Sequence, residues 1–133
     1  MRLYYKVKNK LFYDVDCLRA RWQRFKRGYS YGDVWDMDFW FMRTVKPMLI
    51  HLRDHHCGVP IEFEHDDKAW CDILTDMISC LNMMDASQVY KELGFNNRLN
   101  MTKEDYDTVY RIMEKNKNEF FELFSKYFYN LWD

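Results

Sequence analysis

Apolar side chains recur along most of this chain at intervals of three, four and seven residues. That spacing places them on one face of an α-helix. The first stripe comprises Tyr4, Leu11, Val15, Leu18, Trp22 and Phe25. Only 4 Gly and 2 Pro interrupt the 133 residues, fewer than the turns of an all-β protein require. The sequence therefore predicts an all-α fold.

Local signals divide the chain into four main helices. The first is predicted over residues 4–27 and ends at Gly28, which can adopt a left-handed conformation. Ser30 and Asp33 have the spacing of a capping box, so a second helix is predicted over residues 31–57. A kink or break is expected in it near Arg43–Pro47, because proline lacks the N–H that helices need.

The second half of the chain has similar signals. Asp66 or Asp67 is predicted to cap a third helix that carries an apolar stripe to residue 84. Residues 85–93 could continue this helix or form a separate short fifth helix at 86–93, and Gly94 ends that segment. Thr102 and Asp105 form a second capping-box pattern, so the last main helix is expected to run from there to the C-terminus.

A chain of this length suits one domain, so residues 1–133 are expected to form a single compact helical bundle. The helix after Ser30 is expected to be central to the packing. The predicted core includes Trp35, Phe39, Trp70, Phe124 and Tyr127, and the favoured interpretation of the first helix buries Leu18, Trp22 and Phe25 as well.

Charge is divided unevenly along the chain. Residues 1–28 hold nine basic and two acidic residues, a net +7, and the remaining 105 residues carry a net −8. Such a basic segment attracts anions or lies against an acidic surface. The candidate binding residues are those around the first turn: Arg19, Arg21, Arg24, Lys26, Arg27, Tyr29 and Tyr31.

Aromatic residues make up 19% of the chain, more than one face of each helix needs. Those that fall off the main stripes are Trp40, Phe41, Phe121 and Tyr129. Such side chains indicate either a wider core or an interface, where aromatic anchors dominate binding.

Metal binding and catalysis are both disfavoured. His51 and His55 are four residues apart, and His65 or Cys71 could complete a zinc site, but histidines near a helix end are more often surface residues. No nucleotide-binding loop or hydrolase signature is present, so no enzyme and no cofactor is predicted.

The four cysteines show no CxxC pair, which favours free thiols. No apolar run reaches 18 residues, so no membrane span is expected.

Three segments carry a resemblance. Residues 27–30 (RGYS) with Asp33, Trp35, Asp38 and Pro47, residues 70–78 (WCDILTDMI), and the ending LFSKYFYNLWD at 123–133 together resemble small tailed-phage accessory proteins. Most of these proteins are uncharacterised, so the resemblance implies a phage origin and the cytoplasm of an infected bacterium. It implies no defined activity.

The leading hypothesis is a non-catalytic phage protein that binds and blocks a host protein, as an anti-defence inhibitor would. Its partner would have an acidic surface. The alternative is sequestration of an anionic, nucleotide-type signalling ligand, and the third is a metal-dependent hydrolase. A solvated basic face is favoured over nucleic-acid binding, and the oligomeric state stays open.

Overall fold

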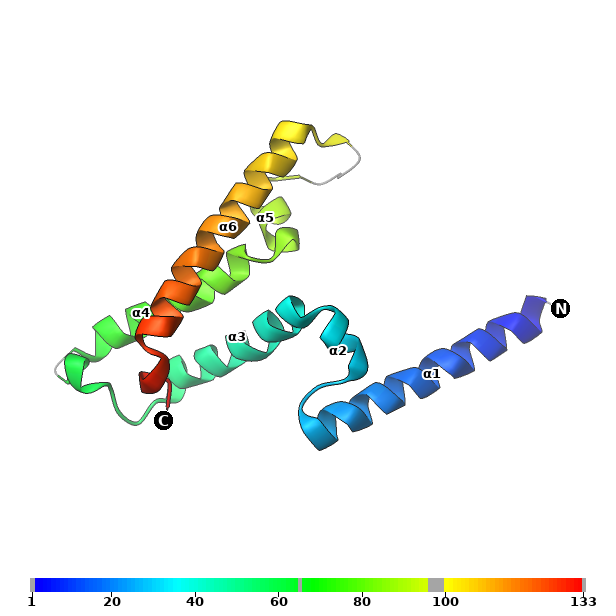
Figure 1. Ribbon diagram of the computed structural model, residues 1–133, viewed down its shortest axis with the longest axis horizontal. Coiled ribbons are helices and arrows are strands. Elements are labelled where there is room, and N and C mark those ends of the chain that lie inside the picture. Colours follow the sequence, from blue (N-terminus) through cyan, green and yellow to red (C-terminus); the bar gives the residue numbers. More distant parts are fainter. Residues whose placement is uncertain (1, 65, 96–99, 133) are drawn as a thin grey trace. The chain divides into compact units, whose positions relative to one another are not determined.

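The computed structural model describes residues 2–64, 66–95 and 100–132, with side chains from residue 14 onward (Figure 1). Every regular element among them is helical, which confirms the all-α prediction. These elements are α1 (Arg2–Arg27), α2 (Tyr31–Trp35), α3 (Met37–His55), η1 (Ile61–Phe63), α4 (Asp67–Met83), α5 (Ala86–Glu92), α6 (Lys103–Lys126) and η3 (Phe128–Asn130). None of the described helices is both long and apolar enough to cross a membrane.

The chain divides into two compact units, Met1–Phe41 and Met42–Asp133. The first holds α1, α2 and the first residues of α3. The second holds the rest of α3 and the helices that follow. The length of the chain had predicted a single domain over 1–133.

The predicted caps are confirmed. Gly28 and Gly94 both have positive φ, 80° and 74°, and they follow α1 and α5. The Asp33 carboxylate accepts a hydrogen bond from the Ser30 amide at 2.7 Å. Asp66 accepts from the Ala69 amide at 2.9 Å, and Thr102 accepts from the Asp105 amide at 3.2 Å. Each bond satisfies a donor that a helix N-terminus leaves open.

Two predicted boundaries are wrong. A kink or a break was expected near Arg43–Pro47, but the helix predicted over 31–57 is broken at Asp36, whose φ of −123° and ψ of 56° separate α2 from α3. Helix α3 continues through Pro47, which lies on an exposed part of the helix. Helix α6 ends at Lys126 instead of reaching the C-terminus. Tyr127 leaves the helical conformation there, and its side chain is buried.

The core of the second unit lies where α4 packs along α6, with α5 beside both (Figure 1). Its largest fully buried side chains are those of Trp70 and Phe120. Trp70 also meets Phe63 and Tyr127 in an aromatic cluster, with ring centroids 5.6 Å and 5.7 Å away. The predicted burial of Trp70 and Tyr127 is therefore confirmed, and Phe124 is half-buried.

The predicted core position of Trp35 and Phe39 is wrong. Trp35 is 89% exposed and Phe39 is 49% exposed. Helix α2 ends at Trp35, so the helical register on which the expected stripe depended is interrupted at Asp36. The buried apolar residues of α3 are Leu49 and Leu52, which lie in the second unit.

Candidate binding surface

One face of α1 carries four large apolar side chains that are all mostly exposed. Val15, Leu18, Trp22 and Phe25 follow one another at intervals of three and four residues, and we call them the α1 stripe. Leu18 is 63% exposed, Trp22 60% and Phe25 82%. The rings of Trp22 and Phe25 stack with their centroids 5.9 Å apart. Within the first unit, these four side chains therefore form an apolar surface that is mostly exposed.

The expected burial of Leu18, Trp22 and Phe25 is wrong, and the reason is architectural. Within the first unit, only the five-residue α2 and the first residues of α3 are available to pack against α1. The apolar period of the sequence predicts which side chains share a face. It does not determine whether another element covers that face.

Basic side chains border the α1 stripe. Arg19, Arg21 and Lys26 are exposed, and the Lys26 ammonium lies 6.0 Å from the centroid of the Trp22 ring. Among the side chains that the structure describes, Arg19 and Arg21 form no ion pair. Their charges therefore add to the field at the stripe, where they attract carboxylates.

Arg24 has a different role from the one predicted. Its guanidinium forms a two-point ion pair with Asp33, with Nε 2.8 Å from Oδ2 and Nη2 2.6 Å from Oδ1. The hydrogen bond from Arg24 holds the pKa of the Asp33 carboxyl well below its usual range, and the Ser30 amide adds to that effect. Arg24 therefore joins α1 to the cap of α2 and is not free to serve a partner.

Arg27 is also engaged within the first unit. Its guanidinium carbon lies 4.9 Å from the Tyr29 ring centroid and 4.3 Å from that of Tyr31. Interaction with Arg27 lowers the pKa of the Tyr31 hydroxyl. The Tyr31 amide in turn donates to the Gln23 side chain at 3.0 Å. One face of each tyrosine is thus occupied, which leaves less ring surface for stacking a nucleotide base.

The off-stripe aromatics divide into two groups. Trp40 and Phe41 are half-buried, and Trp40 lines a small cavity of about 270 Å³ with Tyr29 and Asp33. Phe121 is partly exposed and packs edge-on against Phe120 at 5.2 Å. Tyr129 is 89% exposed. Of the four predicted interface aromatics, Phe121 and Tyr129 thus present the most open surface.

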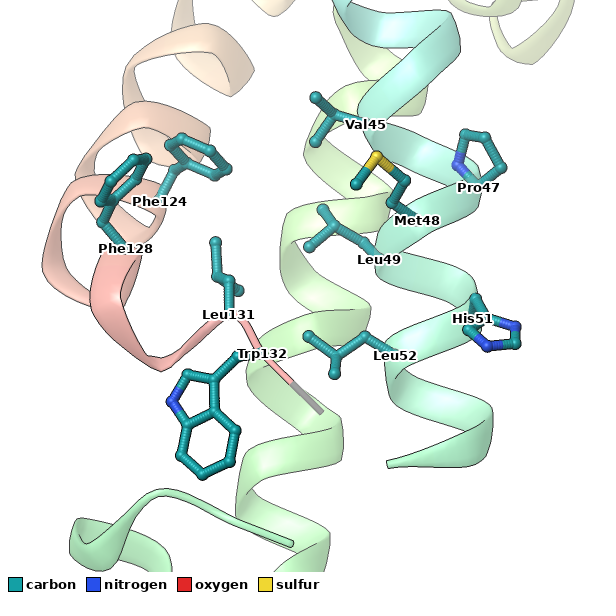
Figure 2. A pocket seen from close by; sticks show the side chains of 10 residues that line it. All are labelled: Val45, Pro47, Met48, Leu49, His51, Leu52, Phe124, Phe128, Leu131 and Trp132. Atoms are coloured by element: carbon teal, nitrogen blue, oxygen red, sulfur yellow. The ribbon is translucent and has the colours of Figure 1, made fainter. Parts of the chain in front are cut away.

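A larger apolar cavity of about 600 Å³ lies in the second unit between α3 and the end of the chain (Figure 2). Its lining residues are almost all apolar: Val45, Pro47, Met48, Leu49, His51, Leu52, Phe124, Phe128, Leu131 and Trp132. Phe124 and Phe128 line it from one side and α3 from the other (Figure 2). Its lining holds no acid–base pair, so the cavity offers shape and apolar surface only.

The structure describes three of the four candidate metal ligands, His51, His55 and Cys71. His51 and His55 stack on each other at 4.5 Å, and the His55 ring contacts the His51 carbonyl. His65 lies outside the described residues. Cys71 lies instead near His56 and Asp67, the one group of three such ligands in the described part of the chain. His56 was missed because no short spacing in the sequence links it to Asp67 and Cys71.

The chain matches no protein-family profile, no curated protein and no solved structure.

Proposed function

We propose that the protein is a non-catalytic binding protein that inserts the α1 stripe into an apolar groove of another protein. The single observation that carries this proposal is the exposure of Val15, Leu18, Trp22 and Phe25 on one helix face. Amphipathic helices that bind grooves present anchors at this spacing. Large exposed apolar patches on soluble domains mark interaction sites, and Trp is enriched among the residues that dominate binding energy.

The chemistry of the partner follows from the border of the stripe. Arg19, Arg21 and Lys26 place positive charge beside the apolar side chains. A groove edged by Asp and Glu would pair with them, speed the encounter and fix the register of the helix. A groove edged by Lys or Arg would be repelled.

The tailed-phage resemblance of the RGYS segment and of the chain ending suggests a bacterial host protein as the partner. Occupying a groove on a host protein excludes the ligand that the groove normally takes. We therefore propose that the protein blocks its partner, as an anti-defence inhibitor would. Nucleotide sequestration is less favoured, because Asp33 engages Arg24 and the rings of Tyr29 and Tyr31 engage Arg27.

Photo-crosslinking tests the position of the contact. A photoreactive amino acid replaces Leu18 in one version of the protein and the exposed Tyr110 of α6 in a control version. In host extract, the Leu18 probe should crosslink one protein, at an apolar groove bordered by carboxylates, and the Tyr110 probe should not. Crosslinking of the partner by the Tyr110 probe alone would place the contact on α6 and contradict the proposal.

A further inference from the structure

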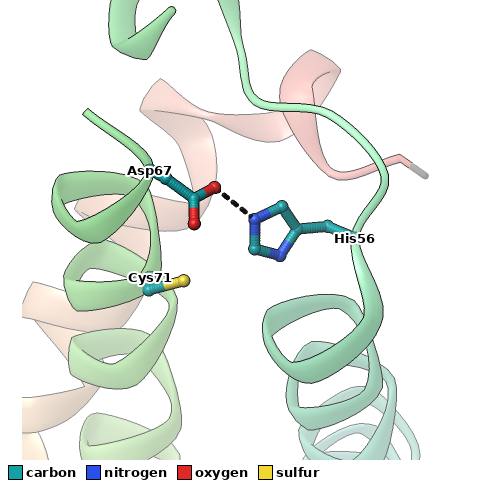
Figure 3. A group of neighbouring side chains, drawn as sticks. All are labelled: His56, Asp67 and Cys71. Atoms are coloured by element: carbon teal, nitrogen blue, oxygen red, sulfur yellow. Dashed lines mark hydrogen bonds and ion pairs between the residues drawn. The ribbon is translucent and has the colours of Figure 1, made fainter. Parts of the chain in front are cut away.

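Three potential metal ligands from two elements of the second unit converge near the end of α3. His56 follows the last residue of α3, whereas Asp67 and Cys71 lie one turn apart at the start of α4 (Figure 3). The ligand atoms of all three lie within 4.8 Å of one another. His56 Nε2 is 2.8 Å from Asp67 Oδ1, and the Cys71 sulfur points toward the imidazole ring (Figure 3).

The backbone fixes the orientation of the His56 ring. Nδ1 lies 3.0 Å from the Arg53 carbonyl oxygen and 3.2 Å from that of Leu52. A carbonyl oxygen only accepts hydrogen bonds, so Nδ1 must carry a proton and donate it. Nε2 is then the nitrogen that can bind a metal, and a hydrogen bond at the other ring nitrogen is what metal-binding histidines usually have. The side chain is only 10% exposed, so this arrangement is held by packing.

We propose that His56, Asp67 and Cys71 bind a zinc ion. Imidazole nitrogen, carboxylate oxygen and thiolate are the ligands that zinc takes in proteins. At tetrahedral zinc, Nε2 and the carboxylate oxygen would lie about 3.4 Å apart, given zinc–ligand distances of about 2.0–2.1 Å. The present distance of 2.8 Å between His56 Nε2 and Asp67 Oδ1 would therefore increase slightly. Asp67 is 74% exposed, so its side chain can make that adjustment.

Zinc would replace the proton that His56 shares with Asp67 and the proton of the Cys71 thiol, and these protons would pass to solvent. A cavity of about 380 Å³ adjoins two of the three ligands, and its lining includes His56, Cys57, Glu64 and Asp67. A water molecule can complete the tetrahedron. The ion would join the end of α3 to the start of α4 and close the connection between them. This role lies outside α1 and is independent of the proposed function.

The test titrates purified, metal-free full-length protein with Zn²⁺ in competition with a chromophoric chelator. The wild type should bind one Zn²⁺. Cys71→Ser and His56→Gln should each raise the Kd for Zn²⁺ at least about tenfold. The loss of a group that only hydrogen-bonds to a metal ligand already weakens metal binding by that factor. The matched controls Cys80→Ser and His55→Gln should bind like the wild type, because Cys80 is buried near Glu119 and His55 stacks on His51.

Substitution by Co²⁺ gives a second readout that does not depend on stability. Thiolate coordination produces a sulfur-to-metal charge-transfer band, which the wild type and Cys80→Ser should show and Cys71→Ser should lack. Circular dichroism would check that each variant is folded. A wild type that binds no Zn²⁺ would overturn the proposal. Binding that survives Cys71→Ser and is lost in His55→Gln would also overturn it.

Discussion

The contact between Arg24 and Asp33 shows how one side chain can change the role of a basic segment. Arg24 looked like part of a binding surface because the sequence shows only that it belongs to a cluster of positive charge. In the structure it forms the ion pair that holds the turn between α1 and α2, which we call the corner. Asp33 is only 8% exposed there. A double replacement of Arg21 and Arg24 would thus damage the corner as well as the surface. Arg19 and Arg21 are the appropriate pair for charge reversal.

Asp33→Asn should destabilise the first unit at neutral pH by about 1–2 kcal/mol. Asn keeps the shape but loses charge-assisted hydrogen bonds, and the exposure of Arg24 limits the loss. The folded-state pKa of Asp33 lies below its ordinary value of 3.8. The ion pair therefore stabilises the fold above about pH 4. That contribution is lost as the pH falls through the folded-state pKa.

Hydrogen exchange at the Ser30 amide measures this effect directly, since that amide donates to Asp33. Exchange at pH 7 should be faster in Asp33→Asn than in the wild type. The control is Asp16→Asn, which removes an exposed carboxylate on α1. Equal protection of the Ser30 amide in the wild type and Asp33→Asn would show that the ion pair does not hold the corner.

Trp70 and Trp35 provide a second comparison at the scale of single residues. Trp70→Ala should cost roughly 3–5 kcal/mol, because it removes a ring that is 1% exposed and packs against Phe63 and Tyr127. Trp35→Ala should change the free energy of unfolding by no more than about 0.5 kcal/mol, because Trp35 is almost fully exposed. Denaturant unfolding would measure both. A large loss in Trp35→Ala would mean that a partner element covers α2.

At the scale of elements, the sequence predicted helix ends that carry a local signal better than those that carry none. Asp66 and Thr102 cap helices in the structure by local hydrogen bonds within three residues, so the local sequence is sufficient. The break at Asp36 and the end of α6 at Lys126 have no such local marker. The second depends on the packing of Tyr127 against Phe63 and Trp70, which are distant in sequence.

The glycine that ends α1 gives a prediction at this scale. Gly28→Ala should destabilise the first unit by about 1 kcal/mol, because φ at Gly28 is 80° and a Cβ is unfavourable there. Crowding is not the cause, since an added Cβ would meet nothing within 4 Å. Gly58 is equally open and has no positive φ, so Gly58→Ala is the control. Thermal melts followed by circular dichroism should separate the two variants.

At the scale of the whole molecule, the same apolar period led to two outcomes. In the second unit the stripe of α4 is covered by α6, and its residues are buried as expected. In the first unit the α1 stripe is exposed. The period determines which residues share a face, but covering that face depends on contacts between distant parts of the chain, which spacing alone does not reveal. The fold class and most elements were therefore predictable, and the candidate surface was only partly so.

The four thiols give a prediction for the entire chain. Cys17, Cys57, Cys71 and Cys80 form no disulfide in the structure. Unfolding without reductant, in the presence of a metal chelator, should therefore expose four thiols to Ellman's reagent. In the native protein, Cys71 and Cys80 should react slowly, because burial raises the pKa of both thiols. A count of two or none after unfolding would indicate disulfides.

The measurement that tests the central claim most directly is the Kd of the purified complex between this protein and the partner crosslinked through Leu18. Trp22→Ser with Phe25→Ser should raise Kd by at least about 100-fold, because anchors of this kind dominate interfaces. Tyr106→Ser with Tyr110→Ser, a matched loss of two exposed aromatics from α6 in the other unit, should leave it unchanged. Wild-type Kd should also rise with salt, since Arg19 and Arg21 border the α1 stripe. An unchanged Kd for the Trp22 and Phe25 variant, or binding indifferent to salt, would contradict the account.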